Sequence, residues 1–202
     1  MLSTQEQVLA SFVTLKQMLA DRGSAAESLA ALGDKELLEL CSTQSIFTLE
    51  VNDTLNVVYY LTKMKIAEFK SAMFGRAKDI DEADIRKNDD KTFLFIFKED
   101  ISAQNRKSIT EFFKRHQVFQ ITHLLFNVSQ HSLVPKHVVM RDEAELQDLF
   151  ARFHIKSKAL LPSIQQADPM AKYLGLVPGD IVKILRPSPT AGNYNYYRVC
   201  VA

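Results

Sequence analysis

The sequence lacks the features that mark a membrane-spanning or secreted protein. No apolar run approaches the roughly 20 residues that cross a bilayer, and the first residues do not follow the basic-then-apolar order of a secretory signal. Its two cysteines, Cys41 and Cys200, lie far apart and outside any CxxC pair, which favours reduced thiols, buried or inert, over a disulfide framework. We therefore expect an intracellular, soluble protein.

A nucleotide-binding loop is also missing. None of the six glycines is followed by lysine, so the glycine-rich loop ending in Gly-Lys-Ser/Thr is absent. Asp81-Glu82-Ala83-Asp84 spells a helicase box, but without that loop a solvated segment of mixed charge over residues 78–91 is the better interpretation.

Charge of one sign is scarce. The formal net charge is +1; residues 1–128 have a net charge of −2 and residues 129–202 a net charge of +3. Neither part would hold DNA by itself through phosphate neutralisation. Any contact with nucleic acid must therefore be local or shared with partners.

No residue pattern predicts catalysis. A metal-dependent nuclease is the most serious alternative, since Glu50 and Asp53 lie at a predicted hairpin, but residues 56–63 of the next strand contain no acid to bind a second metal. No Ser-His-Asp or Cys-His arrangement has a supporting motif. We expect no catalytic residue, metal, cofactor or small-molecule substrate. The histidines follow no zinc spacing: His116, His123, His131, His137 and His154.

Residues 1–128 have the alternating helices and strands of an α/β domain with helices on a mixed sheet. Val8, Phe12, Leu15 and Leu19 repeat at helical spacing before Gly23. A strand, a helix that Ser102 caps, and a further strand predict a crossover with parallel pairing. The other expected elements are helices over 25–32, 35–41 and 66–73, a hairpin over 46–51 and 55–61, and strands over 92–97 and 124–128.

Residues 129–202 predict a smaller α+β unit. An extended stretch over 133–140 precedes the capping box Asp142–Glu145, and Asp168-Pro169 starts a second helix that Gly175 ends. Pro178-Gly179 is typical of a type II turn, and strands follow over 181–186 and 196–201. A unit of this size is marginal alone, and a large partner would stabilise it. The helix that follows the capping box at Asp142–Glu145 is expected to bury Leu146, Leu149, Phe150 and Phe153.

The stretch RPSPTAGNYNYYR, residues 186–198, has the composition of a protein-binding segment. Pro187 and Pro189 remove two backbone donors, so we expect a rigid open loop, in which Gly192 permits a backbone turn. Tyrosine and arginine dominate interface energetics. The alternative is that these aromatic residues only close a small domain.

Motifs over about residues 124–202 resemble the fifth subunit common to eukaryotic RNA polymerases, a family similar to a small subunit of archaeal RNA polymerases. They are His131–His137 (HSLVPKH), Leu161–Gln165 (LPSIQ), Asp168–Tyr173 (DPMAKY), Gly175–Ile184 (GLVPGDIVKI) and Arg186–Gly192 (RPSPTAG) up to Tyr197-Arg198. Residues 15–23 and 93–107 resemble the jaw domain of the same eukaryotic subunit more loosely.

The resemblance implies a jaw domain over 1–128 and an assembly domain over 129–202. It implies a non-catalytic subunit of a nuclear DNA-directed RNA polymerase, docked on the largest subunit near the small sixth subunit, with the jaw beside downstream double-stranded DNA. A free-standing transcription scaffold or regulator with the same assembly domain is the alternative. The residues that we assign to partner binding are Pro162, Asp168, Pro169, Tyr173, Arg186, Pro187, Thr190, Gly192, Tyr196, Tyr197 and Arg198.

One departure from the family lies in the jaw. Where the family has a Thr-Pro-Ser-Ala loop facing DNA, this chain has Asp100-Ile101-Ser102-Ala103, and aspartate would repel phosphate. Ser102, Arg106 and Lys107 remain candidate DNA-facing residues, since a helix N-terminus with basic side chains suits a phosphate; a plain surface helix cap fits them equally. The departure also fits a diverged copy dedicated to one polymerase class, as in kinetoplastids.

Overall fold

The chain divides into two compact units, Met1–Phe126 and Asn127–Ala202. The computed structural model describes residues 2–24, 29, 31–75, 90–188, 190 and 192–202. Most of the predicted helix at 25–32 and of the charged loop at 78–91, with its helicase-like box, lies outside the described residues, as does Pro189. Each unit combines helices with a mixed four-stranded sheet, in agreement with the predicted fold classes.

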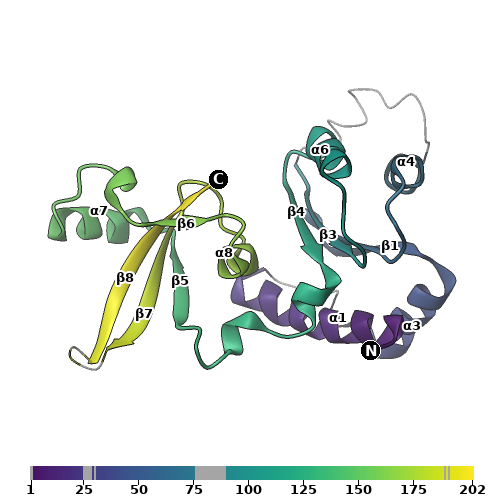
Figure 1. The fold of residues 1–202 in the computed structure, drawn as a ribbon, viewed down its shortest axis with the longest axis horizontal. Coiled ribbons are helices and arrows are strands. Elements are labelled where there is room, and N and C mark those ends of the chain that lie inside the picture. The colour runs from purple at the N-terminus through teal and green to yellow at the C-terminus, as the bar shows by residue number, and fades with distance from the viewer. Residues whose placement is uncertain (1, 25–28, 30, 76–89, 189, 191) are drawn as a thin grey trace. The chain divides into compact units, whose positions relative to one another are not determined.

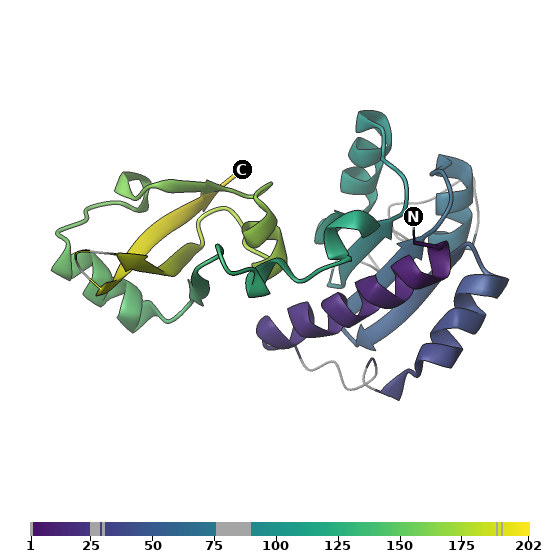
Figure 2. The same ribbon diagram turned by 60° about the horizontal axis from the view of Figure 1, so that its bottom comes forward.

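The first unit places helices on both faces of its sheet, whose strand order is β1-β2-β3-β4 (Figures 1 and 2). β1 and β2 form the predicted antiparallel hairpin, and β2, β3 and β4 are parallel. The elements are α1 (Thr4–Asp21), α3 (Asp34–Thr43), β1 (Ile46–Asn52), β2 (Leu55–Tyr60), α4 (Ile66–Phe74), β3 (Thr92–Phe97), α6 (Ala103–Phe112), β4 (His116–Gln120) and the 3-10 helix η1 (Ile121–Leu124).

An aromatic core fills the face of this sheet under α4 and α6. Phe95 is fully buried, and its ring lies 5.2 Å from that of Phe113 and 5.5 Å from that of Phe69. On the opposite face α1 packs on the sheet, where the Ser11 and Tyr59 hydroxyls share a buried hydrogen bond of 3.2 Å. Each helix is stabilised by burying apolar side chains, at about 1.5–3 kcal/mol for each large one.

The predicted strand at 124–128 is wrong. The fourth strand lies earlier, at β4, and pairs parallel with β3 after the α6 crossover, so the predicted pairing holds with a different partner. β4 is an edge strand, and Phe119 is its one buried residue. Its sequence therefore lacks the run of apolar residues that would have predicted a strand. The apolar residues Ile121 and Leu124 instead form η1, which packs against α1.

The second unit has the strand order β5-β7-β8-β6, with β6 parallel to β8 and the other pairs antiparallel. Asp168 caps α8 with Pro169 in its first turn, and Gly175 ends it at φ 68°. Gly179 adopts φ 96° in the predicted turn, which an L-residue would adopt only with strain. The elements are η2 (Val128–Gln130), β5 (Lys136–Met140), α7 (Glu143–Arg152), η3 (Lys158–Leu160), β6 (Ser163–Gln165), α8 (Pro169–Leu174), β7 (Ile181–Ser188) and β8 (Gly192–Val201).

α7 covers only part of its sheet face. Leu149 packs with Met140, Ile181 and Val199, and Leu146 and Phe150 are partly buried beside them. The prediction that Phe153 is buried is wrong, since 52% of its surface is exposed. Phe153 lies beyond the last turn of α7, and its ring centroid lies 5.9 Å from that of Tyr197 in the sheet.

The remaining expectations concern cysteines, metals and membranes. Cys200 is buried and Cys41 half-buried; both are free thiols, and burial raises the pKa of each. Within the described ranges, no three His, Cys, Asp or Glu side chains lie close enough to hold a metal ion. No described helix is long and apolar enough to cross a membrane.

Candidate functional site

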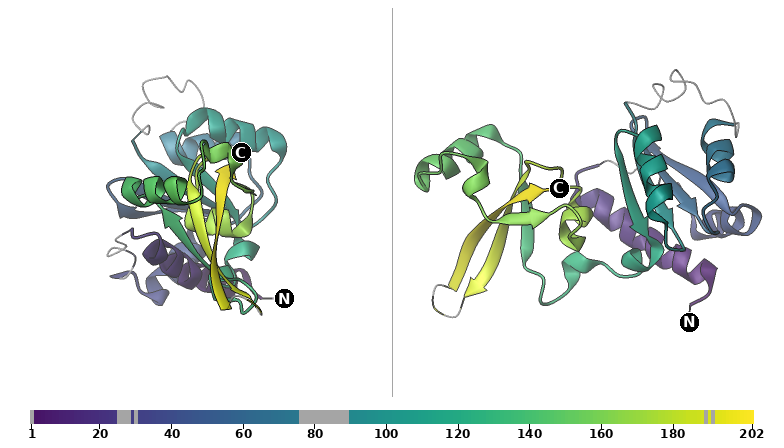
Figure 3. Two further views of the ribbon diagram at one scale, coloured as in Figure 1. Left: turned by 90° about the vertical axis from the view of Figure 1, so that its left-hand side faces the viewer. Right: turned by 45° about the horizontal axis from the view of Figure 1, so that its top comes forward.

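The hairpin β7–β8 carries most of the residues predicted for partner binding (Figure 3). The open loop expected over 186–198 is mostly wrong: residues 186–188 pair with residues 192–194, so the strands continue to the tip. Gly192 adopts φ 68° at that tip, which agrees with its predicted turn. The segment is therefore a two-stranded arm that is paired as far as its tip.

Pro187 lies inside a strand because its missing N–H is not needed there. The Cys200 amide donates to the Asp180 carbonyl at 2.8 Å. In an antiparallel pair every second residue bonds to the same neighbour, so Pro187 belongs to the set of β7 residues that face β5. The β5 ladder ends where Lys136 pairs with Leu185, so Pro187 costs no ladder bond.

Strand alternation divides the arm into two faces, because residues directly opposite each other project to the same side. Ile184 pairs with both His137 and Tyr196, and Arg186 pairs with Tyr194. With Arg198, two residues beyond Tyr196, these six make the arginine face. The opposite side, the α7 face, includes Lys136, Val138, Met140, Ile181, Lys183, Leu185, Pro187, Tyr197 and Val199.

A groove of about 310 Å³ lies on the arginine face, between the sheet, the start of α8 and the segment before β5. We call it the arginine groove. Its floor is apolar and its rim is mostly basic, which suits a protein segment that offers both apolar and acidic groups. It is lined by Leu133, Val134, Pro135, His137, Ile164, Asp168, Met170, Ile184, Arg186, Tyr196 and Arg198.

Two guanidinium groups and one tyrosine ring form the rim of the arginine groove. The Arg186 and Arg198 guanidinium carbons lie 5.6 Å and 5.3 Å from the Tyr196 ring centroid, so the ring holds both cations in place. Arg198 Nη1 also donates to the Ser163 carbonyl at 2.8 Å. Within the described part of the chain neither guanidinium forms an ion pair. Both therefore have donors left for a carboxylate or carbonyl.

The other polar groups of the groove are held by the fold. Asp168 accepts from the Met170 amide at 2.8 Å and from the Ala171 amide at 3.4 Å, so its carboxylate serves the N-terminus of α8. His137 Nδ1 lies 2.7 Å from the Pro135 carbonyl, which accepts, so Nδ1 carries the proton.

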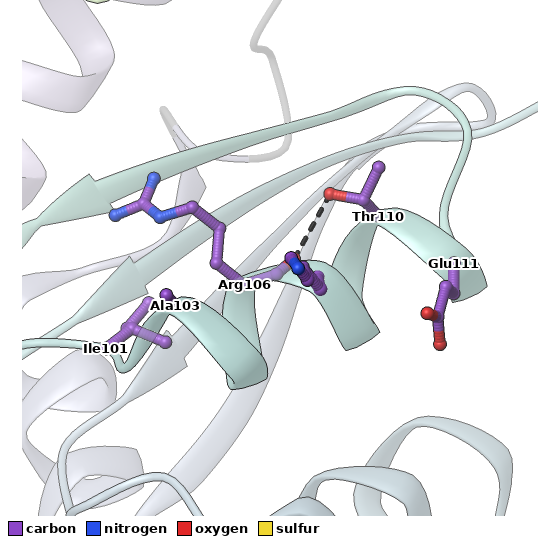
Figure 4. Close-up of a pocket in the computed structure, with 6 residues that line it drawn as sticks. Ile101, Ala103, Arg106, Thr110 and Glu111 are labelled. Carbon is purple, nitrogen blue, oxygen red and sulfur yellow. Dashed lines mark hydrogen bonds between the residues drawn. The ribbon is translucent and has the colours of Figure 1, made fainter.

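A second candidate surface lies on α6 of the first unit. Arg106 and Lys107 line an open depression of about 650 Å³ together with Ile101 and Thr110, and Figure 4 shows Arg106 and Glu111 pointing in different directions from the helix. Ser102 caps the helix by accepting from the Asn105 amide at 3.3 Å, and it does not line the depression. The structure thus groups two of the three predicted DNA-facing residues.

Comparison with known proteins agrees with the family predicted from the motifs. Residues 126–200 match the family described as RNA polymerase Rpb5, C-terminal domain. The C-terminal unit belongs to the Rpb5 family. A Dictyostelium discoideum protein, DNA-directed RNA polymerases I, II, and III subunit rpabc1, is 38% identical over 112 residues, which cover 54% of this chain and 56% of that protein. The Caenorhabditis elegans and Caenorhabditis briggsae proteins named RPABC1 are each 53% identical over 78 residues, 39% of this chain and 36% of theirs. The chain therefore spans about half or less of the length of these relatives.

The Rpb5 domain places the predicted partner-binding residues in four settings. Asp168, Arg186, Tyr196 and Arg198 line the groove. Tyr173 is buried, and its hydroxyl accepts from Asn127 Nδ2 at 3.0 Å, so it holds α8 in place and exposes little to a partner. Exposed positions outside the groove are Pro162, Pro169, Thr190 and Gly192, and those on the α7 face are Pro187 and Tyr197.

Several groove residues of the Rpb5 domain were not predicted as site residues. Ile184, Ile164 and Met170 form its apolar floor, and His137 was considered only as a metal ligand. A predicted hairpin whose strands stay paired as far as the tip would have placed Ile184 opposite Tyr196. No signal in the sequence indicated the register, because the two prolines favoured a loop.

Proposed function

We propose that the chain is a non-catalytic structural subunit of a nuclear DNA-directed RNA polymerase. The match of residues 126–200 to the Rpb5 family carries this proposal. The named relatives in Dictyostelium and Caenorhabditis are subunits of polymerases I, II and III, which supports the same role here. In this role the chain performs no chemical step, and the residues that matter are those that bind its neighbours.

The arginine groove is the proposed contact with the largest subunit, beside the small sixth subunit. Arg186 and Arg198 are held against Tyr196 before any partner binds, so little side-chain entropy is lost on association. A partner segment that brings carboxylates or carbonyls to the rim and an apolar side chain to the floor would satisfy both. The same contact would stabilise a unit that is small for an independent domain.

The first unit is the proposed jaw beside downstream DNA. Arg106 and Lys107 would contribute a local contact with phosphate that acts within the assembled polymerase, because residues 1–128 have a net charge of −2. Asp100, just before α6, opposes such a contact. This surface is therefore expected to contribute less than the arginine groove.

Affinity purification of the tagged full-length chain, followed by mass spectrometry, tests the proposed function. We expect the large polymerase subunits in equal ratio to the tagged chain, and the identity of the largest subunit tells whether the chain serves one polymerase class or several. A stable, unassociated chain that is absent from polymerase preparations, in salt that keeps the polymerase intact, contradicts the proposal.

A free-standing transcription scaffold or regulator is the second candidate. It is favoured by one observation: the family match covers residues 126–200, which is the second unit with one residue of the first. Recovery of a few transcription factors in place of the full set of polymerase subunits would support this candidate.

A further inference from the structure

An apolar strip is exposed on the α7 face of the second unit. The exposed fractions of Val138, Leu185 and Phe153 are 41%, 36% and 52%. Tyr197 links them, since it lies in one row with Lys183 and Val138 and its ring contacts that of Phe153. We call Val138, Leu185, Tyr197 and Phe153 the apolar strip. Adjacent exposed apolar side chains of this kind mark interaction sites more often than isolated ones do.

The strip is exposed because α7 ends before it. Leu149 of α7 packs with Met140, Ile181 and Val199, and Tyr197 of the next row lies at the edge of this cluster. Among the described residues, the cluster includes none of the rows nearer the tip of the arm. The β7–β8 hairpin continues past Lys136, the first residue of β5, so these rows belong to a sheet whose strands are already paired. A partner that binds here would find the surface already formed.

Three cations surround the apolar strip. Lys183 lies in the same row as Val138 and Tyr197, Lys136 pairs with Leu185, and the Arg152 guanidinium lies 5.6 Å from the Phe153 ring centroid. In the described residues none of the three forms an ion pair. The strands β5, β6, β7 and β8 contain no aspartate or glutamate, so no acid of this sheet neutralises them.

We propose that the α7 face binds an acidic peptide segment of a second protein, with aliphatic or aromatic side chains between its carboxylates. The apolar side chains would pack on the strip, and the carboxylates would pair with Lys136, Lys183 and Arg152. Charge complementarity favours this partner over two others. The three cations would repel a basic segment, and they would bind a nucleic acid without using the apolar strip.

The α7 face is independent of the arginine groove. Neighbouring residues of a strand project to opposite sides, so Lys183 and Leu185 lie on one face and Ile184 and Arg186 on the other. A chain seated in a polymerase through its arginine groove would thus present the α7 face to a further protein. The inference goes beyond the proposed function and adds a second, acidic partner.

A labelled peptide and the full-length chain test the inference. The probe is a short fluorescein-labelled peptide in which glutamates flank a leucine and a phenylalanine, and fluorescence anisotropy measures its binding. We expect Lys183→Glu and Leu185→Ser to weaken binding by about tenfold each. Lys136→Glu, at an exposed position, should also weaken it. The arginine groove would accept a peptide of the same kind, so each variant is measured in a chain that also carries Arg186→Glu. Arg186→Glu, next to Leu185 but on the opposite face, should leave the binding at the α7 face unchanged.

Further outcomes separate the possible explanations. Far-ultraviolet circular dichroism checks that each variant is folded, and Lys136→Glu gives the answer if Lys183→Glu fails to fold. Equal binding of a peptide with glutamine in place of glutamate overturns the inference, and so does binding that Arg186→Glu abolishes completely. Loss of the polymerase from purified Lys183→Glu or Lys136→Glu chains also overturns it, since the face would then serve assembly. Peptide binding by a chain that recovers no polymerase contradicts the proposed function and supports the inference.

Discussion

The two units differ in how completely their sheets are covered. In the first unit α1 lies on one face and α4 and α6 on the other, and strand β3 is almost fully buried. In the second unit the β7–β8 arm extends past the helices of that unit. Of the eleven large apolar side chains that are exposed among the described residues, eight belong to the second unit. The first sheet is stabilised within its own unit, whereas the second leaves apolar and basic surface on both faces for other proteins.

Removing a core ring should have the largest effect, in the first unit. Phe95→Ala deletes a fully buried ring that contacts Phe69 and Phe113, and should lower the free energy of unfolding by about 3–5 kcal/mol. Phe153→Ala, at an exposed ring of the second unit, should cost less than about 1 kcal/mol. Urea denaturation followed by circular dichroism measures both. Similar losses for the two variants would remove the contrast between the units.

Charge reversal in the arginine groove should act on assembly. Arg186→Glu replaces a cation that has no carboxylate partner in the described chain, so stability should change little. The yield of co-purified polymerase should fall about tenfold, the loss expected for a central arginine. Lys183→Gln, on the opposite face, is the control. An unchanged yield with Arg186→Glu would place the polymerase contact elsewhere on the chain.

The cap of α8 should have a moderate effect on the second unit. Asp168→Ala removes the acceptor for the Met170 and Ala171 amides and should destabilise the unit by about 1 kcal/mol. Asp148→Ala, at an exposed position within α7, should stay within about 0.5 kcal/mol of the wild type. Thermal denaturation compares the two. Equal effects would mean that the cap does not hold the wall of the groove.

Loss of one basic side chain from α6 should have a small effect. Arg106→Gln should reduce the salt dependence of downstream-duplex binding by the purified polymerase, by about one unit in the slope of log K against log salt. Lys16→Gln on α1, on the other face of the sheet, is the control. Identical slopes for Arg106→Gln and the wild type would leave α6 as a plain surface helix.

The smallest effect should come from pH in the first unit. Burial lowers the pKa of His116, whose Nδ1 bonds to the Phe113 carbonyl at 2.7 Å. The unfolded chain then binds a proton more readily than the folded one below about pH 6.5, so stability should rise with pH through the range below that value. His116→Gln should flatten this rise in denaturation curves collected at several pH values. An equally steep rise in the variant would assign it to other groups.

Local chemistry made much of the fold predictable. The starts of α6, α7 and α8 at Ser102, Asp142 and Asp168 agree with the sequence, because a capping side chain and its amide partner are neighbours in the chain. β4 was missed because an edge strand needs only one buried side chain, so its sequence has no apolar run. The strand through Pro187 was missed because its tolerance depends on where β5 ends, which is a tertiary fact.

The candidate site was predictable in composition and less so in arrangement. The motifs indicated Arg186, Tyr196 and Arg198, which the fold brings into one groove. Tyr196 and Tyr197 lie in the predicted strand over 196–201, so alternation separates them, but the residues that each one faces depend on the register with β7. Tyr173 is buried and accepts a bond from Asn127, and a contact between residues so far apart in the sequence is set by the tertiary fold.

The position of Pro187 also bears on solubility. Beyond Lys136, the first residue of β5, no strand of the described residues pairs with that side of β7. An open backbone edge of this kind invites pairing between copies of a chain. A strand that approached this side would meet a proline with no amide hydrogen to donate. The arm thus offers its side chains to partners while it discourages its own copies from adding to the sheet.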